Sequence, residues 1–501
     1  MKKYIYSLIS LSLFGIMILN SSCGNREDNP ADLVSRFVYD GMSSYYLWAD
    51  EMIDKEPTSK DSDPKSYFQR ILNSTDKEHG WSFITDDVQS LLADFAGEPK
   101  SFGFSFDFAQ LKNTGDILAV IQYLFPNTPA SDAGLERLDV IAKIDGEAIT
   151  QNNYTKLYGS ETATFTVGRV VNSVFVQDKE IKLTPRTIAT DPVLYTNIYE
   201  IGGKKIAYLF YTDFISNYNK SLYKAFSKFK SEGVTDLVLD LRYNHGGAIT
   251  AATYLSSMIA PKTVVEEKSP FAILSYNNFL NQHFGQSIDS LGVYNSENDQ
   301  NPLDANLNLN KVYIIATSDS YSASELTAFC LKPYMDVVHI GENTGGKYTA
   351  SFTLHPYDEG IGVPIYDESK LSTTIKRKFA NWAMQPIIAK YTNCRNEDFS
   401  TPGHLVPDHF LQEGNWDINN WAQIGDTKDG YLGQAIYMIT GDESYKPTYK
   451  ASVHKVNKVD RETSIKLSNP NDFRKEAVIL DNVNFPFIDF KKLIDSVDSK
   501  H

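Results

Sequence analysis

Cysteine is scarce in this chain, which has only three in 501 residues. No cysteine or histidine cluster has the spacing of a zinc site, so we expect neither a metal nor another cofactor. Whether Cys330 and Cys394 form a disulfide stays open. Basic clusters are also missing, and the net charge of −15 argues against nucleic acid as a partner. These absences leave an acidic protein with ample apolar residues for large cores.

The apolar run Ile5–Leu19 is short for a membrane span, and Met1-Lys2-Lys3 before it completes the pattern of an export signal. Cys23 follows small residues and resembles the lipidated cysteine of bacterial lipoproteins. Asn20 departs from that pattern, so ordinary signal cleavage is the alternative. We expect residues 1–23 to be a signal peptide. The mature protein would lie in the bacterial cell envelope, anchored to the membrane by lipid and facing the periplasm or the surface.

Changes in hydrophobic period divide the rest of the chain. Residues 24–94 combine a polar tether with helical periodicity, and from Ser101 the period becomes strand-like. Within 95–188, Pro129–Leu135 and Leu138–Gly146 resemble a PDZ domain, with an Asp-Gly hairpin turn. This resemblance implies that peptide C-termini bind near Phe102, Gly103 and Phe104. Residues 189–440 alternate strands and helices, 271–310 look like an irregular insertion or lid, and 441–501 form a tail of unknown role.

Within the stretch 311–351, Ser322 and Lys347 each lie shortly after a predicted strand. Lys311–Thr317 predicts a buried strand, a helix begins near Ser322, and Val337–Ile340 predicts the next strand before a glycine-rich loop that ends in Lys347. In a parallel βαβ unit, Ser322 and Lys347 would both lie at the carboxyl edge of the sheet. A buried, neutral lysine can act as the base that a serine nucleophile needs.

The run Ser322-Ala323-Ser324-Glu325, followed by Lys347 within Gly341-Glu342-x-Thr344-x-Gly346-Lys347, resembles the active-site signature of C-terminal (tail-specific) processing peptidases of family S41. In that family the first serine is the nucleophile and the lysine is the base. The resemblance spans roughly 95–440 and implies an α/β multidomain protein. The expected parts are an N-terminal helical module, a PDZ-like β-rich domain and a crotonase/ClpP-like peptidase core. Its substrates would be polypeptides with free C-termini, whereas the oligomeric state is not predicted.

A third motif, from Asp240 to Gly247, has the D-L-R-x-N-x-G-G form that is another signature of this family. Glycine allows backbone amides to approach a ligand closely. The amides of Gly246 or Gly247, together with that of Ala323, would form an oxyanion hole. His245 lies in the same loop and is an alternative, less favoured base.

Two departures bear on function. The glycine loop before Lys347 matches most of a phosphate-binding loop, but Tyr348 replaces the residue that would hold magnesium, and a strand follows instead of a helix. Ser351 stands where the family often has a glutamine that supports the lysine. The sequence therefore predicts a Ser-Lys endopeptidase of exported or envelope proteins. The alternative is a catalytically inactive, peptide-binding envelope lipoprotein.

Overall fold

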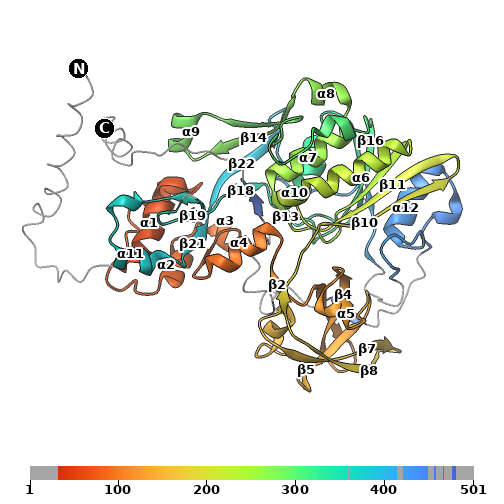
Figure 1. Cartoon of the computed structure of the whole chain (residues 1–501), viewed down its shortest axis with the longest axis horizontal. Coiled ribbons are helices and arrows are strands. Elements are labelled where there is room, and N and C mark those ends of the chain that lie inside the picture. The colour runs from red at the N-terminus through yellow and green to blue at the C-terminus, as the bar shows by residue number, and fades with distance from the viewer. Residues whose placement is uncertain are drawn as a thin grey trace, which may run out of the picture.

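The computed structural model describes residues 32–358, 360–413, 421–448, 456–458, 467 and 477–480. Figure 1 shows N-terminal helices on the left, a helix-covered sheet at the centre, a small β-unit below it and α12 (Gly430–Thr440) on the right. The expected signal peptide and Cys23 lie outside the described residues. Within them, no helix is long and apolar enough to cross a membrane, and no cluster of three acidic, histidine or cysteine residues could hold a metal.

The central sheet has the strand order β10-β11-β12-β16-β17-β23, and only the β10–β11 pair is antiparallel. The strands predicted before the two reactive segments, at 311–317 and 337–340, are confirmed as β16 and β17. The six strands are β10 (Val193–Ile201), β11 (Lys204–Tyr211), β12 (Asp236–Asp240), β16 (Lys311–Ala316), β17 (Asp336–Gly341) and β23 (His409–Phe410).

Both faces of this sheet are covered. In β11, Ala207 and Leu209 face the helices α6 (Asn219–Ser231), α7 (Ile249–Ile259) and α10 (Ala323–Leu331), whereas Ile206 and Tyr208 pack against α12. Successive strand residues point to opposite faces, so a nearly continuous apolar run serves a sheet with helices on both sides. The carboxyl ends of β12, β16 and β17 meet at one edge, where the loops bearing the candidate site begin.

A second sheet lies beside this edge, with the order β13-β25-β18-β22-β14-β15. Strand β25 comes from the C-terminal tail and runs parallel to both of its neighbours, β13 and β18. The strands are β13 (Gly246–Ala248), β25 (Ala477–Ile479), β18 (Thr349–Ser351), β22 (Ile387–Asn393), β14 (Pro270–Tyr276) and β15 (Ser287–Ser290).

The expectation that 271–310 is irregular was wrong for its first half, up to Ser290. This segment supplies β14, α9 (Asn278–Phe284) and β15, and β14 pairs with both β15 and β22. Phe271, Ala272 and Leu274 are buried in the main core. The short apolar run was overlooked because the asparagine-rich residues after it dominate the composition of the segment.

The N-terminal helices are those that the periodicity predicted. They are α1 (Leu33–Tyr45), α2 (Pro64–Ile71), α3 (Ser74–His79) and α4 (Val88–Ala96). Phe37 and Met42 of α1 belong to the same apolar cluster as the helices of the central sheet. β1 (Phe83–Thr85) pairs with β21 (Ala383–Gln385), in a sheet with β19 (Leu354–His355) and β20 (Val363–Pro364), and α11 (Thr373–Phe379) packs nearby.

The small β-unit, residues 100–187, is an antiparallel sheet with one short helix, α5 (Pro129–Asp132). The predicted turn at Asp145-Gly146 is confirmed, and both residues have positive φ, as a tight hairpin requires. The tail strand β24 (Val456–Lys458) extends the sheet by pairing antiparallel with β3. Its other strands are β3 (Phe104–Leu111), β4 (Ile117–Leu124), β5 (Val140–Ile144), β6 (Glu147–Ala148), β7 (Ala163–Val171) and β8 (Val174–Leu183). In addition, β2 (Lys100–Ser101) and β9 (Arg186–Thr187) form a separate pair.

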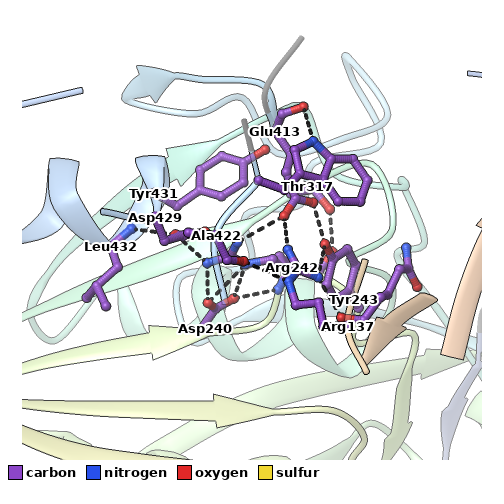
Figure 2. Close-up of polar contacts among 12 residues, drawn as sticks. Arg137, Asp240, Arg242, Tyr243, Thr317, Glu413, Ala422, Asp429, Tyr431 and Leu432 are labelled. Carbon is purple, nitrogen blue, oxygen red and sulfur yellow. Dashed lines mark hydrogen bonds and ion pairs between the residues drawn. The ribbon is translucent and has the colours of Figure 1, made fainter. Parts of the chain in front are cut away.

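A buried ionic network joins the small β-unit to the central sheet (Figure 2). The fully buried Arg242 guanidinium lies between Asp240, at 2.7 Å, and Asp429, at 2.8 Å. Arg137 of the small β-unit binds Glu413 at 2.5 Å, and Glu413 lies 3.3 Å from Arg242. One connected set of charges thus fixes the loop after β12 against both α12 and the small β-unit.

Removing the central cation of this network should destabilise the core strongly. Arg242→Met leaves two carboxylates buried without their partner, so we expect the free energy of unfolding to fall by about 3–5 kcal/mol. Lys262→Met is the matched control, because Lys262 forms an exposed ion pair with Glu266 at 3.2 Å and such pairs contribute about 1 kcal/mol or less. Urea unfolding of both variants measures the difference, and equal losses would contradict the role given to the network.

Candidate active site

Ser322 lies between β16 and α10 in a strained backbone conformation. Its φ of +59° is in the left-handed region, which costs a residue with a side chain roughly 1–2 kcal/mol. The residue is fully buried, and among the described residues its hydroxyl has no hydrogen-bond partner. Strain of this kind persists only where surrounding contacts impose it. A strained, unengaged hydroxyl at a strand-to-helix turn suits a nucleophile.

Glu325 connects this serine to the lysine loop. Its Oε2 accepts the N–H groups of Ser322, at 2.8 Å, and Lys347, at 2.7 Å. Its Oε1 accepts the Gly346 N–H at 2.8 Å and the Thr344 hydroxyl at 2.5 Å. Burial raises the pKa of Glu325 to about 7, although these four donors act in the opposite direction. A single carboxyl group therefore sets the backbone positions of both reactive residues.

Tyr391 on β22 makes a second link between the same two residues. Its hydroxyl lies 2.9 Å from the carbonyl oxygen of Lys347 and 3.4 Å from that of Ser322. Lys347 is fully buried. Gly346, just before it, has φ +92°, and a side chain there would meet the Gly403 carbonyl at 2.1 Å. The structure thus brings Ser322 and Lys347 into one buried site, as the sequence predicted.

The loop from Asp240 to Gly247 reaches the same site through Asn244. The Asn244 carbonyl accepts from the Tyr321 N–H at 3.1 Å and from the Ser324 hydroxyl at 2.9 Å. Gly246 then lies against Ser322, since a side chain on Gly246 would meet the Ser322 Cβ at 2.8 Å. This approach explains why glycine is required at Gly246.

The candidate oxyanion donors differ in availability. Ala323 is the first residue of α10, so no helical carbonyl accepts from its N–H, and it lies 3.0 Å from the position of a Gly246 side chain. The Gly246 N–H, by contrast, donates to the Asn244 side chain at 2.9 Å. Gly247 lies in β13, aligned with Val478 of the tail strand. The Gly246 amide can therefore serve as a second oxyanion donor only after a local change that releases it from Asn244.

Ser351, which departs from the family pattern, contacts a glutamine side chain from another strand. The Gln385 side chain on β21 donates to the Ser351 hydroxyl at 3.2 Å and accepts from the Thr353 hydroxyl at 2.7 Å. Both Ser351 and Gln385 are fully buried. The Gln385 side chain thus lies near the position where the family often has a glutamine, but it comes from β21 and not from position 351.

The N-terminal helices add a buried acid to the neighbourhood of the lysine. Asp76 accepts the Tyr46 hydroxyl at 2.7 Å and the Ser82 N–H at 2.8 Å. Burial raises the pKa of Asp76, while these hydrogen bonds act to lower it, as Lys347 would in its protonated form. His245, the alternative base, stacks edge-on with Tyr321, with ring centroids 6.1 Å apart.

The proposed peptide-binding loop lies away from this site, between β2 and β3. Phe102 is buried in the core of the small β-unit, and its carbonyl accepts the Ala130 N–H at 3.0 Å. The Gly103 N–H donates to the Ser101 side chain at 3.1 Å. Phe104 begins β3, whose outer edge carries the tail strand β24.

Sequence reasoning missed the roles of Glu325, Asn244, Tyr391 and Gln385. Glu325 and Asn244 stand inside recognised motifs, and a buried position beside a glycine turn was the signal that could have marked them. Tyr391 and Gln385 carry no local signal, because their contacts depend on strand pairing. Cys330 and Cys394 form no disulfide in this structure.

The chain resembles known proteins over most of its length. Residues 205–388 match Peptidase family S41, and 34–83 match the Peptidase S41 N-terminal domain. A carboxyl-terminal-processing protease of Picosynechococcus is 24% identical over 73% of this chain and 77% of the relative. One from Synechocystis is 20% identical over 82% and 85%, respectively.

A solved structure supports the fold. A Bacteroides fragilis protein described as an S41 protease has a TM-score of 0.65 and 24% identity, covering 83% of this chain and 99% of that one. The chain therefore carries a peptidase S41 domain at 205–388 and the N-terminal domain of that family at 34–83, which supports a serine-type peptidase.

Proposed function

We propose that the protein is a Ser-Lys endopeptidase that cleaves exported or envelope proteins near their C-termini. The observation that supports this most is the Glu325 carboxyl group, which binds the backbone N–H groups of both Ser322 and Lys347. A structural role for either residue alone would not need the other to be held by the same group. Family membership favours polypeptide substrates.

In the proposed reaction, Ser322 Oγ attacks the scissile carbonyl while the Lys347 amine takes its proton. The role of base requires a neutral amine on Lys347, whose side chain is fully buried. The protonated lysine then donates to the leaving amine, and water repeats the sequence to release the acyl group. The Ala323 amide stabilises the tetrahedral oxyanion. It is joined by the amide of Gly246, once that amide is released from Asn244, or by that of Gly247.

Substrate selection is proposed for the small β-unit, which we take to be PDZ-like, beside a crotonase/ClpP-like core. Its antiparallel sheet and short helix support this. So does the placing of Phe102 and Gly103 directly before β3, which begins at Phe104 and has only the tail strand β24 on its outer side. Peptides bind PDZ domains by adding a strand to such an edge. Lipidation at Cys23 and a position in the cell envelope complete the proposal and rest on the N-terminal sequence.

Replacing either reactive residue should abolish cleavage without unfolding the protein. Ser322→Ala and Lys347→Met are each expected to lower kcat/KM by about 10⁴-fold or more on an unstructured protein with an apolar C-terminus. Ser231→Ala and Lys332→Met, both at exposed positions, are the matched controls. Wild-type cleavage should increase between about pH 7 and pH 10, as a lysine base loses its proton.

Full activity in Lys347→Met would disprove the dyad. If the wild type binds the C-terminal peptide but neither cleaves it nor reacts with a serine-directed phosphonate, the inactive peptide-binding alternative is correct.

Glu325 should make stability depend on pH. The pKa of Glu325 is about 7 in the folded protein against an ordinary value of 4.5, so the folded state binds this proton more tightly than the unfolded chain does. The associated stabilisation is complete below about pH 4.5 and is lost as the pH rises through 7, a change of roughly 3 kcal/mol.

Subtracting the unfolding free energies of Glu325→Gln isolates this dependence from other groups, and a flat difference would contradict it. The amide of the glutamine cannot accept all four hydrogen bonds. We therefore also expect kcat to fall by about 10²-fold, through misplacement of the two reactive residues.

Gly246→Ala tests the close approach to the nucleophile. The added methyl group would lie 2.8 Å from the Ser322 Cβ, so we expect kcat to fall by about 10²–10³-fold. Gly233→Ala is the matched control, because Gly233 also has a positive φ, of +70°, but an added side chain there meets nothing within 4 Å. The control should lose only about 1 kcal/mol of stability and keep its activity. Comparable activity in both variants would show that space at Gly246 is not required.

A further inference from the structure

The described pieces of the C-terminal tail lie at peptide-binding positions of the chain itself. β25 occupies the space between β13 and β18, beside the candidate active site, and appears in Figure 1 as a short dark blue arrow near these labels. β24 pairs with the edge strand of the small β-unit. Leu467 is buried in the cluster that contains Phe102. The tail thus touches both regions that the proposed function assigns to substrate.

The space that β25 fills has the width of one extended peptide. β13 and β18 are separated only by β25, and neighbouring strands lie about 4.8 Å apart, so the two edges are roughly 9.6 Å apart. The edges of β13 and β18 each present backbone N–H and C=O groups to the strand between them. A peptide of any sequence could therefore pair with both, while its side chains would face the two surfaces of the sheet.

The register places the tail directly beside the nucleophile. Ala477 is aligned with Gly246, the residue that approaches Ser322, and Val478 is aligned with Gly247. The Gly247 carbonyl and amide face β25, because the neighbouring Gly246 carbonyl and Ala248 amide are both bonded to Phe214. The tail therefore covers an edge that includes a candidate oxyanion donor.

The other side of β25 is held next to the strand that follows Lys347. The Leu480 N–H donates to the Ser351 carbonyl at 2.9 Å, and Ile479 is aligned with Ser351. Ile479 and Leu480 are 8% and 4% exposed, and Leu480 joins the main apolar core. Burial of two large apolar side chains gives the contact a driving force beyond backbone pairing.

The tail also contacts the small β-unit by strand pairing. β24 runs antiparallel to β3, from Leu111 towards Ala109, and so in the direction of Phe104. Farther along the tail, the Leu467 carbonyl accepts the Tyr158 hydroxyl at 2.8 Å. Strand addition followed by an anchored apolar residue is the way in which extended peptides bind sheet edges.

We propose that the C-terminal tail is an intramolecular ligand of the substrate-binding path, and that residues 477–480 occupy the strand position of a substrate next to Ser322. This inference rests on the proposed function, since it takes the covered site to be the peptidase site. A polypeptide substrate must displace the tail before its scissile bond can reach the serine. The full chain is therefore autoinhibited, and loss or displacement of the tail strand activates it.

A tethered strand competes effectively even when its intrinsic affinity is weak. Short tethers give effective concentrations of about 1 mM. An intrinsic dissociation constant of about 0.1 mM would then lower the apparent affinity for substrate about tenfold. The expected effect appears mainly in KM, because the catalytic groups are unchanged once the tail has left.

Two truncated chains distinguish the effect of β25 from the effect of the residues that follow it. A chain that ends at Leu480 keeps β25, whereas one that ends at Lys475 lacks it. We expect the shorter chain to cleave an unstructured protein with about tenfold higher kcat/KM, and the longer one to match the full chain. A synthetic peptide of residues 474–482 should restore inhibition in competition with substrate, and a scrambled peptide should not. Equal activity of the three chains, with no inhibition by the peptide, would overturn the proposal.

Hydrogen–deuterium exchange on the full chain covers the case in which the shorter chain does not fold. In Ser322→Ala, the amides of 477–480 should be protected without substrate and should lose protection when a saturating peptide substrate binds. Unchanged protection while the substrate is bound would overturn the proposal. Labelling of Ser322 by a phosphonate, in the full chain and in the chain without the tail strand, tests the peptidase function itself. If neither chain is labelled, the proposed function is wrong. If both are labelled equally, only autoinhibition is wrong.

Discussion

The carboxyl group of Glu325 is the constraint on which the active site depends. It lies in the first turn of α10, and it accepts hydrogen bonds from the backbone at both ends of the motif pair. The strained φ of Ser322 and the tight loop before Lys347 would each be unfavourable alone. Because one buried acceptor binds both, moving either residue would leave a donor in the interior without its partner, which costs about 1–3 kcal/mol for each group.

The sequence was informative where function depends on local chemistry. Buried strands before Ser322 and before the glycine loop followed from their β-branched residues, and the Asp145-Gly146 turn followed from its conformational needs. The helices of 32–96 followed from periodicity. That Ser322 and Lys347 would lie at the same edge of the sheet was predictable because parallel strands place their carboxyl ends at one edge.

Contacts made through strand pairing were not predictable in the same way. Gln385 reaches Ser351 only because β21 pairs with β1 and β19, and these strands are two or three residues long. Tyr391 gives no signal beyond that of a buried aromatic residue. The tail strand at 477–479 is three residues long and pairs with segments more than 100 residues away. No local pattern specifies such a partner.

The span of sequence that the site draws on has a consequence for biosynthesis. Asp76 comes from the third helix, Arg242 is held by Asp429 at the start of α12, and the strand beside Ser322 comes from 477–479. A ribosome-bound chain that has emerged only as far as Lys347 therefore carries Ser322 and Lys347 but lacks Glu413 and Asp429, two of the three acidic partners of Arg242. The ionic network around Arg242 therefore cannot be complete until α12 has been made.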